Sequence, residues 1–235
     1  MAKAKSVAGG LGGHNLYIAR PRAGGARGVL VLHAWWGLTP FFEDLCERLA
    51  RQGFTAAAPD FYGGVTASTI AGAKLLRSKV KRAVVASQVA QAAVALRAAC
   101  QGGSSGIGVI GFSLGGYWGL WLAERARPAG GDGAEEPQAV PVAATVVYYA
   151  TRNADYAAST SAFQFHLAET DEYVAASGVR KQHKALQAAG REAEFHTYPG
   201  TTHWFFETDR PDAYHAPAAD LAWQRTLAFL NAHVP

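Results

Sequence analysis

The sequence predicts an α/β domain with a mostly parallel, twisted sheet and helices on both of its faces. Short, continuous apolar runs recur along the chain, and such runs are typical of parallel strands that are buried on both faces. Segments with helical periodicity separate these runs, which is the pattern of a parallel sheet covered by helices. The length of 235 residues lies within the range of one large domain.

The individual elements are predicted from these runs and from the residues that end them. The predicted strands are residues 16–20, 28–34, 55–59, 107–112, 143–150, 162–167 and 192–198. The predicted helices are residues 41–52, a long alanine-rich stretch over 70–99 that is broken once, and residues 115–125, 179–189 and 218–233. Gly53 ends the first helix, because glycine readily adopts the conformation that follows a helix.

No internal repeat or domain boundary is visible, so residues 16–235 are interpreted as one domain. Residues 1–15 are glycine-rich and are predicted to form a flexible N-terminal segment. Residues 127–141 are rich in glycine, proline and charge, and they are predicted to form a loop without regular structure.

The composition narrows the class of function. Apolar residues make up 49% and charged residues 17% of the chain, which is typical of a compact globular protein. The formal charge of +4 is scattered, and the basic run from Arg77 to Arg82 is interpreted as the solvated face of a helix. A nucleic-acid partner is therefore not expected. No apolar run is long enough to span a membrane and no signal peptide is visible, so a cytoplasmic protein without membrane contact is predicted.

The two cysteines, Cys46 and Cys100, lie in predicted helices, and each is expected to be a buried thiol. Their spacing suits neither a disulfide framework nor a metal site. No metal and no cofactor is expected.

The segment Gly-Phe-Ser-Leu-Gly, centred on Ser113, points to chemistry. Glycines such as Gly111 and Gly115 permit a cramped turn between a strand and a helix, and the serine hydroxyl then projects from the end of the sheet. The same pattern also occurs in ordinary glycine-rich loops, and this chain has 26 glycines. The apolar strand before it and the helical run after it favour a nucleophile.

A serine hydroxyl needs a base to accept its proton, and histidine is suited to that task near neutral pH. Of the eight histidines, His203 follows a strand and a short turn, which places it at the same edge of the sheet as Ser113. The alternatives are His14 and His233 near the termini, His183 on a predicted helix, and His166 and His196 within strands, where packing is the expected role.

An acid must orient that imidazole, and Asp171 lies just beyond the strand at 162–167. The resulting order Ser…Asp…His is the one found on α/β-hydrolase sheets. Glu169 and Glu172 are rival acids, although each could be a solvated loop charge. Asp60 also follows a strand but precedes the serine, so it is expected to organise its own turn.

The negative charge that develops on an attacked carbonyl oxygen must be stabilised by two hydrogen-bond donors. The N–H of Leu114, directly after the serine, is one candidate, and the N–H of Trp35, after the strand at 28–34, is the other. Further aromatic residues adjoin these loops. Trp36 and Trp204 are predicted to bind substrate as pocket walls, and Trp118 and Phe205 are expected to be core residues.

With these residues in view, the chain resembles the dienelactone hydrolase family of the α/β-hydrolase superfamily over about residues 16–232. The motifs that carry the resemblance are residues 33–38 (HAWWGL), 58–64 (APDFYGG), 111–116 (GFSLGG), 171–174 (DEYV) and 198–205 (YPGTTHWF). The resemblance implies that Ser113 is the nucleophile, that Asp171 and His203 complete a triad, and that Trp35 and Leu114 are the oxyanion donors.

Three positions depart from the family pattern. Ser113 replaces the usual cysteine, and Ala34 replaces a glutamate that is understood to help activate that thiol. The joint loss is consistent with a serine that is activated by histidine alone. The arginine that binds a substrate carboxylate a few residues after the histidine is missing, and Glu207 stands in that region. The expected activity is therefore hydrolysis, through an acyl-enzyme, of small and largely uncharged esters or lactones.

Two other classes of function remain open on this reading. One is a binding protein that keeps the fold without catalysis, although all three triad residues are present. The other is an acyltransferase or perhydrolase that uses the same triad with a different acceptor. The expected oligomeric state is a monomer or a small homo-oligomer.

Overall fold

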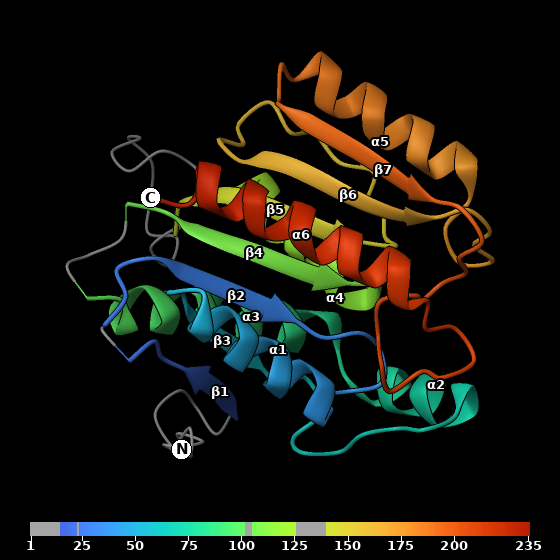
Figure 1. Ribbon diagram of the computed structural model, residues 1–235, viewed down its shortest axis with the longest axis horizontal. Helices are drawn as coiled ribbons and strands as arrows, with labels where there is room; N and C mark the ends of the chain where they lie inside the picture. The colour runs from blue at the N-terminus through green and yellow to red at the C-terminus, as the bar shows by residue number, and fades with distance from the viewer. Residues whose placement is uncertain (1–14, 23, 102–104, 126–139) are drawn as a thin grey trace.

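The computed structural model describes residues 15–22, 24–101, 105–125 and 140–235, and it contains a seven-stranded sheet in the order β1-β3-β2-β4-β5-β6-β7 (Figure 1). The strands are β1 Leu16–Ala19, β2 Gly28–Leu32, β3 Thr55–Pro59, β4 Ile107–Phe112, β5 Val142–Tyr148, β6 Ala162–Ala168 and β7 Ala193–Tyr198. Strand β1 runs antiparallel to β3, and all other neighbouring strands in this sheet are parallel. The predicted fold class is confirmed. The predicted flexible segment 1–15 and the predicted loop 127–141 fall almost entirely outside the described residues.

The helices of the described chain lie close to the predicted ranges, and all neighbours along the chain except α2 and α3 are separated by a strand. They are α1 Pro40–Arg51, α2 Ile70–Lys79, α3 Arg82–Ala99, α4 Leu114–Arg125, α5 Ala176–Ala188 and α6 Ala216–His233. The predicted break in the long alanine-rich stretch lies at Val80 and Lys81, both of which have extended backbone conformations. The α2 helix begins at a cap in which the Thr69 hydroxyl accepts a hydrogen bond from the Gly72 amide at 3.1 Å. Among the described residues, no helix is both long and apolar enough to cross a membrane.

Two hydrophobic layers cover the sheet, one on each face (Figure 1). Helices α1 and α6 contribute to the layer on one face, and α3, α4 and α5 contribute to the layer on the other. The strands serve both layers by alternation. In β2, for example, Val29 and Val31 belong to the first layer, whereas Leu30 and Leu32 belong to the second. Cys46 and Cys100 are free thiols buried in these layers, as predicted.

The carboxyl ends of the parallel strands meet at one edge of the sheet, and the candidate site residues follow them. Trp35 comes after β2, Ser113 directly after β4, and Asp171 after β6. His203 follows β7. The strand order reverses between β2 and β4, and ligands of open α/β sheets bind outside such a reversal. The fold therefore brings residues that are distant in sequence to one place.

Candidate active site

Ser113 occupies a tight turn between β4 and α4, with a φ angle of 50° that falls in the left-handed region. Its amide donates a hydrogen bond to the Tyr148 carbonyl at 3.0 Å, which ties the turn to β5. The flanking glycines are required because a Cβ atom on Gly115 would lie 2.0 Å from the Leu32 carbonyl oxygen. A Cβ atom on Gly111 would lie 2.4 Å from the carbonyl oxygen of Gly115. The local sequence therefore permits a turn that presents the serine hydroxyl.

Three side chains form a hydrogen-bonded chain at this turn. The Oγ of Ser113 lies 2.9 Å from Nε2 of His203. The Nδ1 atom of the same ring lies 2.9 Å and 2.8 Å from the two carboxylate oxygens of Asp171. The carboxylate is itself held by the amides of Tyr173 and Val174, which donate to Oδ1 at 2.8 Å and 2.9 Å. His203 is only 3% exposed, so its imidazole is largely shielded from bulk solvent.

The rival residues have other partners. Glu169 accepts a hydrogen bond from the Gly200 amide at 2.9 Å, and the Asp60 carboxylate accepts from the amides of Tyr62 and Gly64. Asp60 thus organises its turn, as the sequence predicted. Glu172 interacts with Tyr173. His166 is buried in β6 with Tyr198 and Gln164 as partners, and burial holds the pKa of its imidazole well below the usual value.

The two predicted oxyanion donors lie beside the serine. Leu114 is the first residue of α4, and the first N–H groups of a helix have no acceptor within the helix. Trp35, Ser113 and Leu114 line one cavity together. Strand β2 ends at Leu32 rather than at residue 34, because the chain turns there, with the Gly37 amide donating to the Ala34 carbonyl at 3.3 Å.

Aromatic rings form a wall next to His203. The Trp204 ring stacks on the Trp35 ring at 5.8 Å and lies 5.0 Å from the Trp36 ring, measured between centroids. Trp204 itself has a φ angle of 69°. Trp36 is 3% exposed, and Trp36 and Trp204 both line a second cavity beside His203. Trp118 and Phe205 are buried in the core, as expected, although Trp118 also lines the first cavity.

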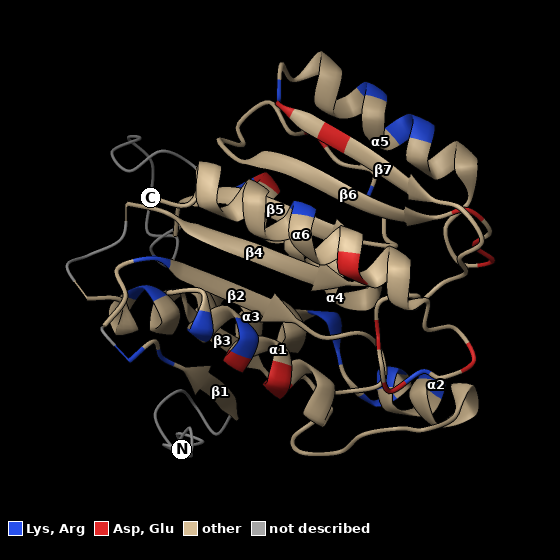
Figure 2. Cartoon of the chain, in the orientation of Figure 1, with Lys and Arg blue, Asp and Glu red and all other residues tan. Residues whose placement is uncertain are grey.

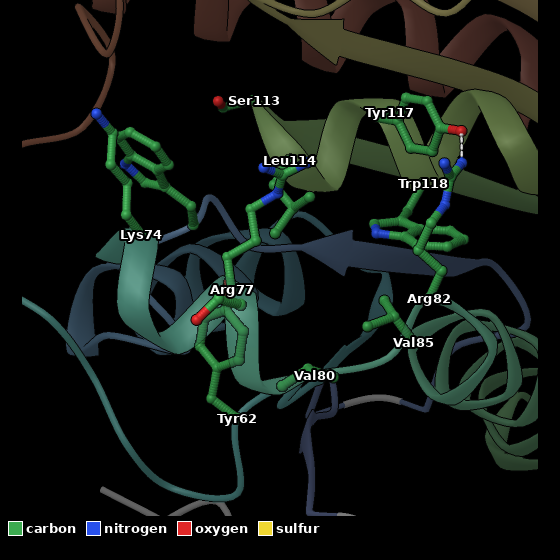
Figure 3. Close-up of a pocket in the computed structure, with 12 residues that line it drawn as sticks. Tyr62, Lys74, Arg77, Val80, Arg82, Val85, Ser113, Leu114, Tyr117 and Trp118 are labelled. Carbon is green, nitrogen blue, oxygen red and sulfur yellow. Dashed lines mark hydrogen bonds between the residues drawn. The ribbon is translucent and has the colours of Figure 1, made fainter. Parts of the chain in front are cut away.

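The cavity beside Ser113 has a volume of about 450 Å³ and a basic lining (Figure 3). Lys74 and Arg77 rise from α2 toward the turn that holds Ser113, as Figure 3 shows, and Arg82 lies farther along at the Tyr117 hydroxyl, to which it donates a hydrogen bond. The lining contains three basic side chains and no carboxylate. The basic run from Arg77 to Arg82 is exposed, as expected, but Arg77 and Arg82 also line this cavity, which the sequence did not predict.

The second cavity, next to His203, has a volume of about 730 Å³ and an acidic lining. Its carboxylates are Glu172, Asp209 and Asp212, against the single basic residue Arg210. The Arg210 guanidinium lies over the Trp36 ring at 4.1 Å and pairs with Asp209 at 3.4 Å. Figure 2 shows basic residues on α2 and acidic residues on the loops that follow β6 and β7.

Comparison with known proteins identifies the family. The model of the dienelactone hydrolase family matches residues 15–234 of this chain. The chain belongs to the dienelactone hydrolase family. It is a hydrolase enzyme of a family that acts on small ester and lactone substrates.

Individual relatives cover nearly the whole of this family member. Protein usf of Aquifex pyrophilus is 31% identical, and the match covers 93% of each chain. A protein of Aquifex aeolicus with the provisional name carboxymethylenebutenolidase is 30% identical, and this match also covers 93% of each chain. A crystal structure from Klebsiella pneumoniae, provisionally named a dienelactone hydrolase, superposes with a TM-score of 0.78 at 25% identity and covers 98% of both chains.

Proposed function

We propose that this protein hydrolyses carboxylic esters or lactones through an acyl-enzyme on Ser113, with His203 as general base and Asp171 as its orienting acid. The observation that carries the proposal is the hydrogen-bonded chain from Ser113 through His203 to Asp171 at the mouth of a basic cavity. That cavity is within the range of roughly 300–1,000 Å³ that is common for small-molecule sites.

The positions of the atoms support the following steps. Nε2 of His203 accepts the Ser113 hydroxyl proton as Oγ attacks the substrate carbonyl carbon. The N–H groups of Leu114 and Trp35 stabilise the resulting oxyanion. The imidazolium then gives its proton to the departing alkoxide, which leaves an ester on Ser113. A water molecule, deprotonated by His203, attacks that ester and restores the serine.

The basic lining supports a substrate that carries an anionic group. Lys74 and Arg77 have no ion-pair partner within the part of the chain that the structure describes, and no carboxylate lines their cavity. A carboxylate or phosphate in the acyl portion would supply the missing charge. Largely uncharged substrates were expected only because the arginine near Glu207 is missing. The basic residues of α2 were not considered in that expectation. We therefore propose small esters or lactones with an anionic acyl portion.

Covalent labelling tests the nucleophile. A fluorophosphonate should inactivate the protein with one equivalent bound, and mass spectrometry should place the adduct on Ser113. The Ser113→Ala variant is the matched control and should not be labelled. Iodoacetamide should leave activity intact, because burial raises the pKa of the Cys46 thiol and the pKa of the Cys100 thiol. Thiol-reagent inactivation with Ser113 unlabelled would contradict the proposal.

A panel of paired substrates tests the reaction. Each pair has the same alcohol and an acyl chain that ends either in a carboxylate or in its neutral amide. We expect hydrolysis of both members and a higher kcat/KM for the anionic member. Activity on neither esters nor lactones, with Ser113 still labelled by the phosphonate, would point to the transfer of acyl groups to an acceptor other than water.

A further inference from the structure

A buried carboxyl group belongs to Glu207, four residues after His203 in the chain. Glu207 is fully buried in the loop between His203 and α6. Its Oε1 accepts a hydrogen bond from the Tyr149 hydroxyl at 2.6 Å. Its Oε2 has no hydrogen-bond partner among the residues that the structure describes. A charged carboxylate in such a position is costly, because one oxygen lacks a donor.

Burial, more than its charged and titratable neighbours, keeps Glu207 neutral. Burial raises the pKa of the Glu207 carboxyl to about 8, and Asp209 adds to that rise. The Tyr149 hydrogen bond and the Arg210 charge act in the opposite direction. Burial and Glu207 together hold the pKa of the Tyr149 phenol well above its usual value, with smaller contributions from Tyr148 and Asp209. The phenol therefore remains protonated and donates to the acid.

Tyr149 connects this acid to the imidazole. Its backbone has a φ of 39°, a left-handed conformation that residues with a side chain rarely adopt. Its amide donates to the His166 carbonyl at 2.8 Å, and its hydroxyl is held by Glu207. Its ring lies 4.8 Å from the His203 ring. Backbone strain that is fixed at both ends and placed against a reactive group is typical of functional sites.

The imidazole needs such a contact. Asp171 and Ser113 each bind one of its two nitrogens, and two such hydrogen bonds alone allow the ring to tilt about the line that joins them. Packing against a ring face fixes that tilt. The rings of Trp204 and Tyr173 also contact His203, at 4.7 Å and 4.8 Å between centroids. Tyr173 is 41% exposed, whereas Tyr149 is fully buried and is held at its hydroxyl by Glu207.

We propose that Glu207 is a positioning residue: by holding the Tyr149 hydroxyl, it presses the Tyr149 ring against His203 and fixes the tilt of the imidazole toward Ser113. The inference rests on the proposed function, since positioning matters only if His203 is the base. Loss of the Glu207 proton would place a charge where one oxygen has no donor, and the loop would then have to move or admit water. Either response would leave the His203 imidazole free to tilt away from Ser113.

The test compares the parent with Glu207→Gln, Glu207→Ala and Tyr149→Phe from about pH 6 to about pH 10. For each protein, kcat and KM are measured on an ester, together with the rate of inactivation by a fluorophosphonate, which needs no turnover. Glu169→Gln is the matched control, because Glu169 is an exposed carboxylate in a loop at the same edge of the sheet.

In the parent, kcat and the inactivation rate should fall above about pH 8, and Glu207→Gln should lack this fall because an amide keeps the shape without ionising. Glu207→Ala should lower kcat by about tenfold at neutral pH with little change in KM, as a small misplacement of a reacting group does. Tyr149→Phe should reproduce that loss. Glu207→Gln should keep most of the activity that Glu207→Ala loses. Glu169→Gln should keep the alkaline fall.

Stability against pH checks the protonation state without any assay of activity. The folded-state pKa of Glu207 is raised from 4.5 to about 8, so the contribution of Glu207 to the free energy of unfolding is fully present below about pH 4.5 and is lost as the pH rises through about 8. Denaturant unfolding at several pH values should show this decline in the parent and a flatter dependence in Glu207→Gln.

Two outcomes would overturn the inference. One is an alkaline fall in Glu207→Gln equal to that of the parent. The other is an unchanged kcat in Tyr149→Phe, which would reduce the pair to a contribution to stability alone. A failure of the proposed function looks different, because no ester would be hydrolysed while the phosphonate still labelled Ser113. In that case the pH profile of inactivation would still decide the role of Glu207.

Discussion

The cavity beside Ser113 and the cavity beside His203 meet at one hydrogen-bonded pair, yet their charges are opposite. Lys74, Arg77 and Arg82 line the first, whereas Glu172, Asp209 and Asp212, with Arg210 as the only basic residue, line the second. The basic residues come from α2 and the start of α3, and the acidic ones come from loops after β6 and β7. By their charges, the first cavity favours anionic groups and the second disfavours them.

The largest effect is expected where the two cavities meet. Ser113→Ala should lower kcat by roughly 10⁴–10⁶-fold, because it removes the nucleophile of a triad. The basic cavity remains, so an anionic product should still bind with a similar Kd when titrated by calorimetry. A variant that kept more than about a tenth of the parent rate would remove Ser113 from the mechanism.

The next effect concerns the acid on the His203 side. Asp171→Asn should lower kcat by roughly 10⁴-fold, because the amide would favour the wrong tautomer of the imidazole. Glu169→Gln and Glu172→Gln are the controls and should each stay within about threefold of the parent, as loop charges do. A larger loss in either control than in Asp171→Asn would show that this glutamate, and not Asp171, is the orienting acid.

A smaller effect tests the basic cavity itself. Arg77→Gln should lower kcat/KM for the anionic ester by about tenfold, the typical contribution of one hydrogen bond to a charged group. The neutral partner ester should be hardly affected. Lys79→Gln is the control, since Lys79 ends the same helix but does not line the cavity. Equal losses on both esters would mean that Arg77 supports the structure of α2 and does not select the charge of the substrate.

The smallest effect tests the acidic cavity. Asp212→Asn should raise kcat/KM about twofold for esters with an anionic alcohol portion, and added salt should reduce the gain, because exposed charges interact weakly. Asp220→Asn is the control, because Asp220 is an exposed carboxylate on α6 that does not line this cavity. If both variants gave the same gain, the effect would come from net charge and the two cavities would not divide the substrate.

Much of the fold could be predicted because its signals are local. Each buried strand is a short apolar run, and the turn at Ser113 depends on glycines that lie within a few residues of it. The gathering of Ser113, Asp171 and His203 could also be predicted, since all three follow strands of a parallel sheet. Whether these three act as a triad stays a prediction that the labelling and the variants test.

The basic cavity could not be predicted, because the position of α2 depends on contacts far from it in the sequence. Only Ala73 of that helix is buried, so periodicity alone gives no sign that Lys74 and Arg77 face a site. The sequence drew attention to Glu207 only because an arginine was expected in that region. Its contact with Tyr149 joins two loops that are distant in sequence, and no local pattern reports such a contact.

The close approach of Gly115 to Leu32 has a consequence for how this enzyme could diversify. The backbone at Ser113 rests directly on the end of the strand that leads to Trp35, so Ser113, Leu114 and Trp35 are held in one rigid unit. Helix α2 stands outside that unit, and most of its residues are exposed. Substitutions in α2 can change which substrate is accepted without disturbing the turn that carries Ser113. New specificities should therefore arise in this scaffold mainly through α2.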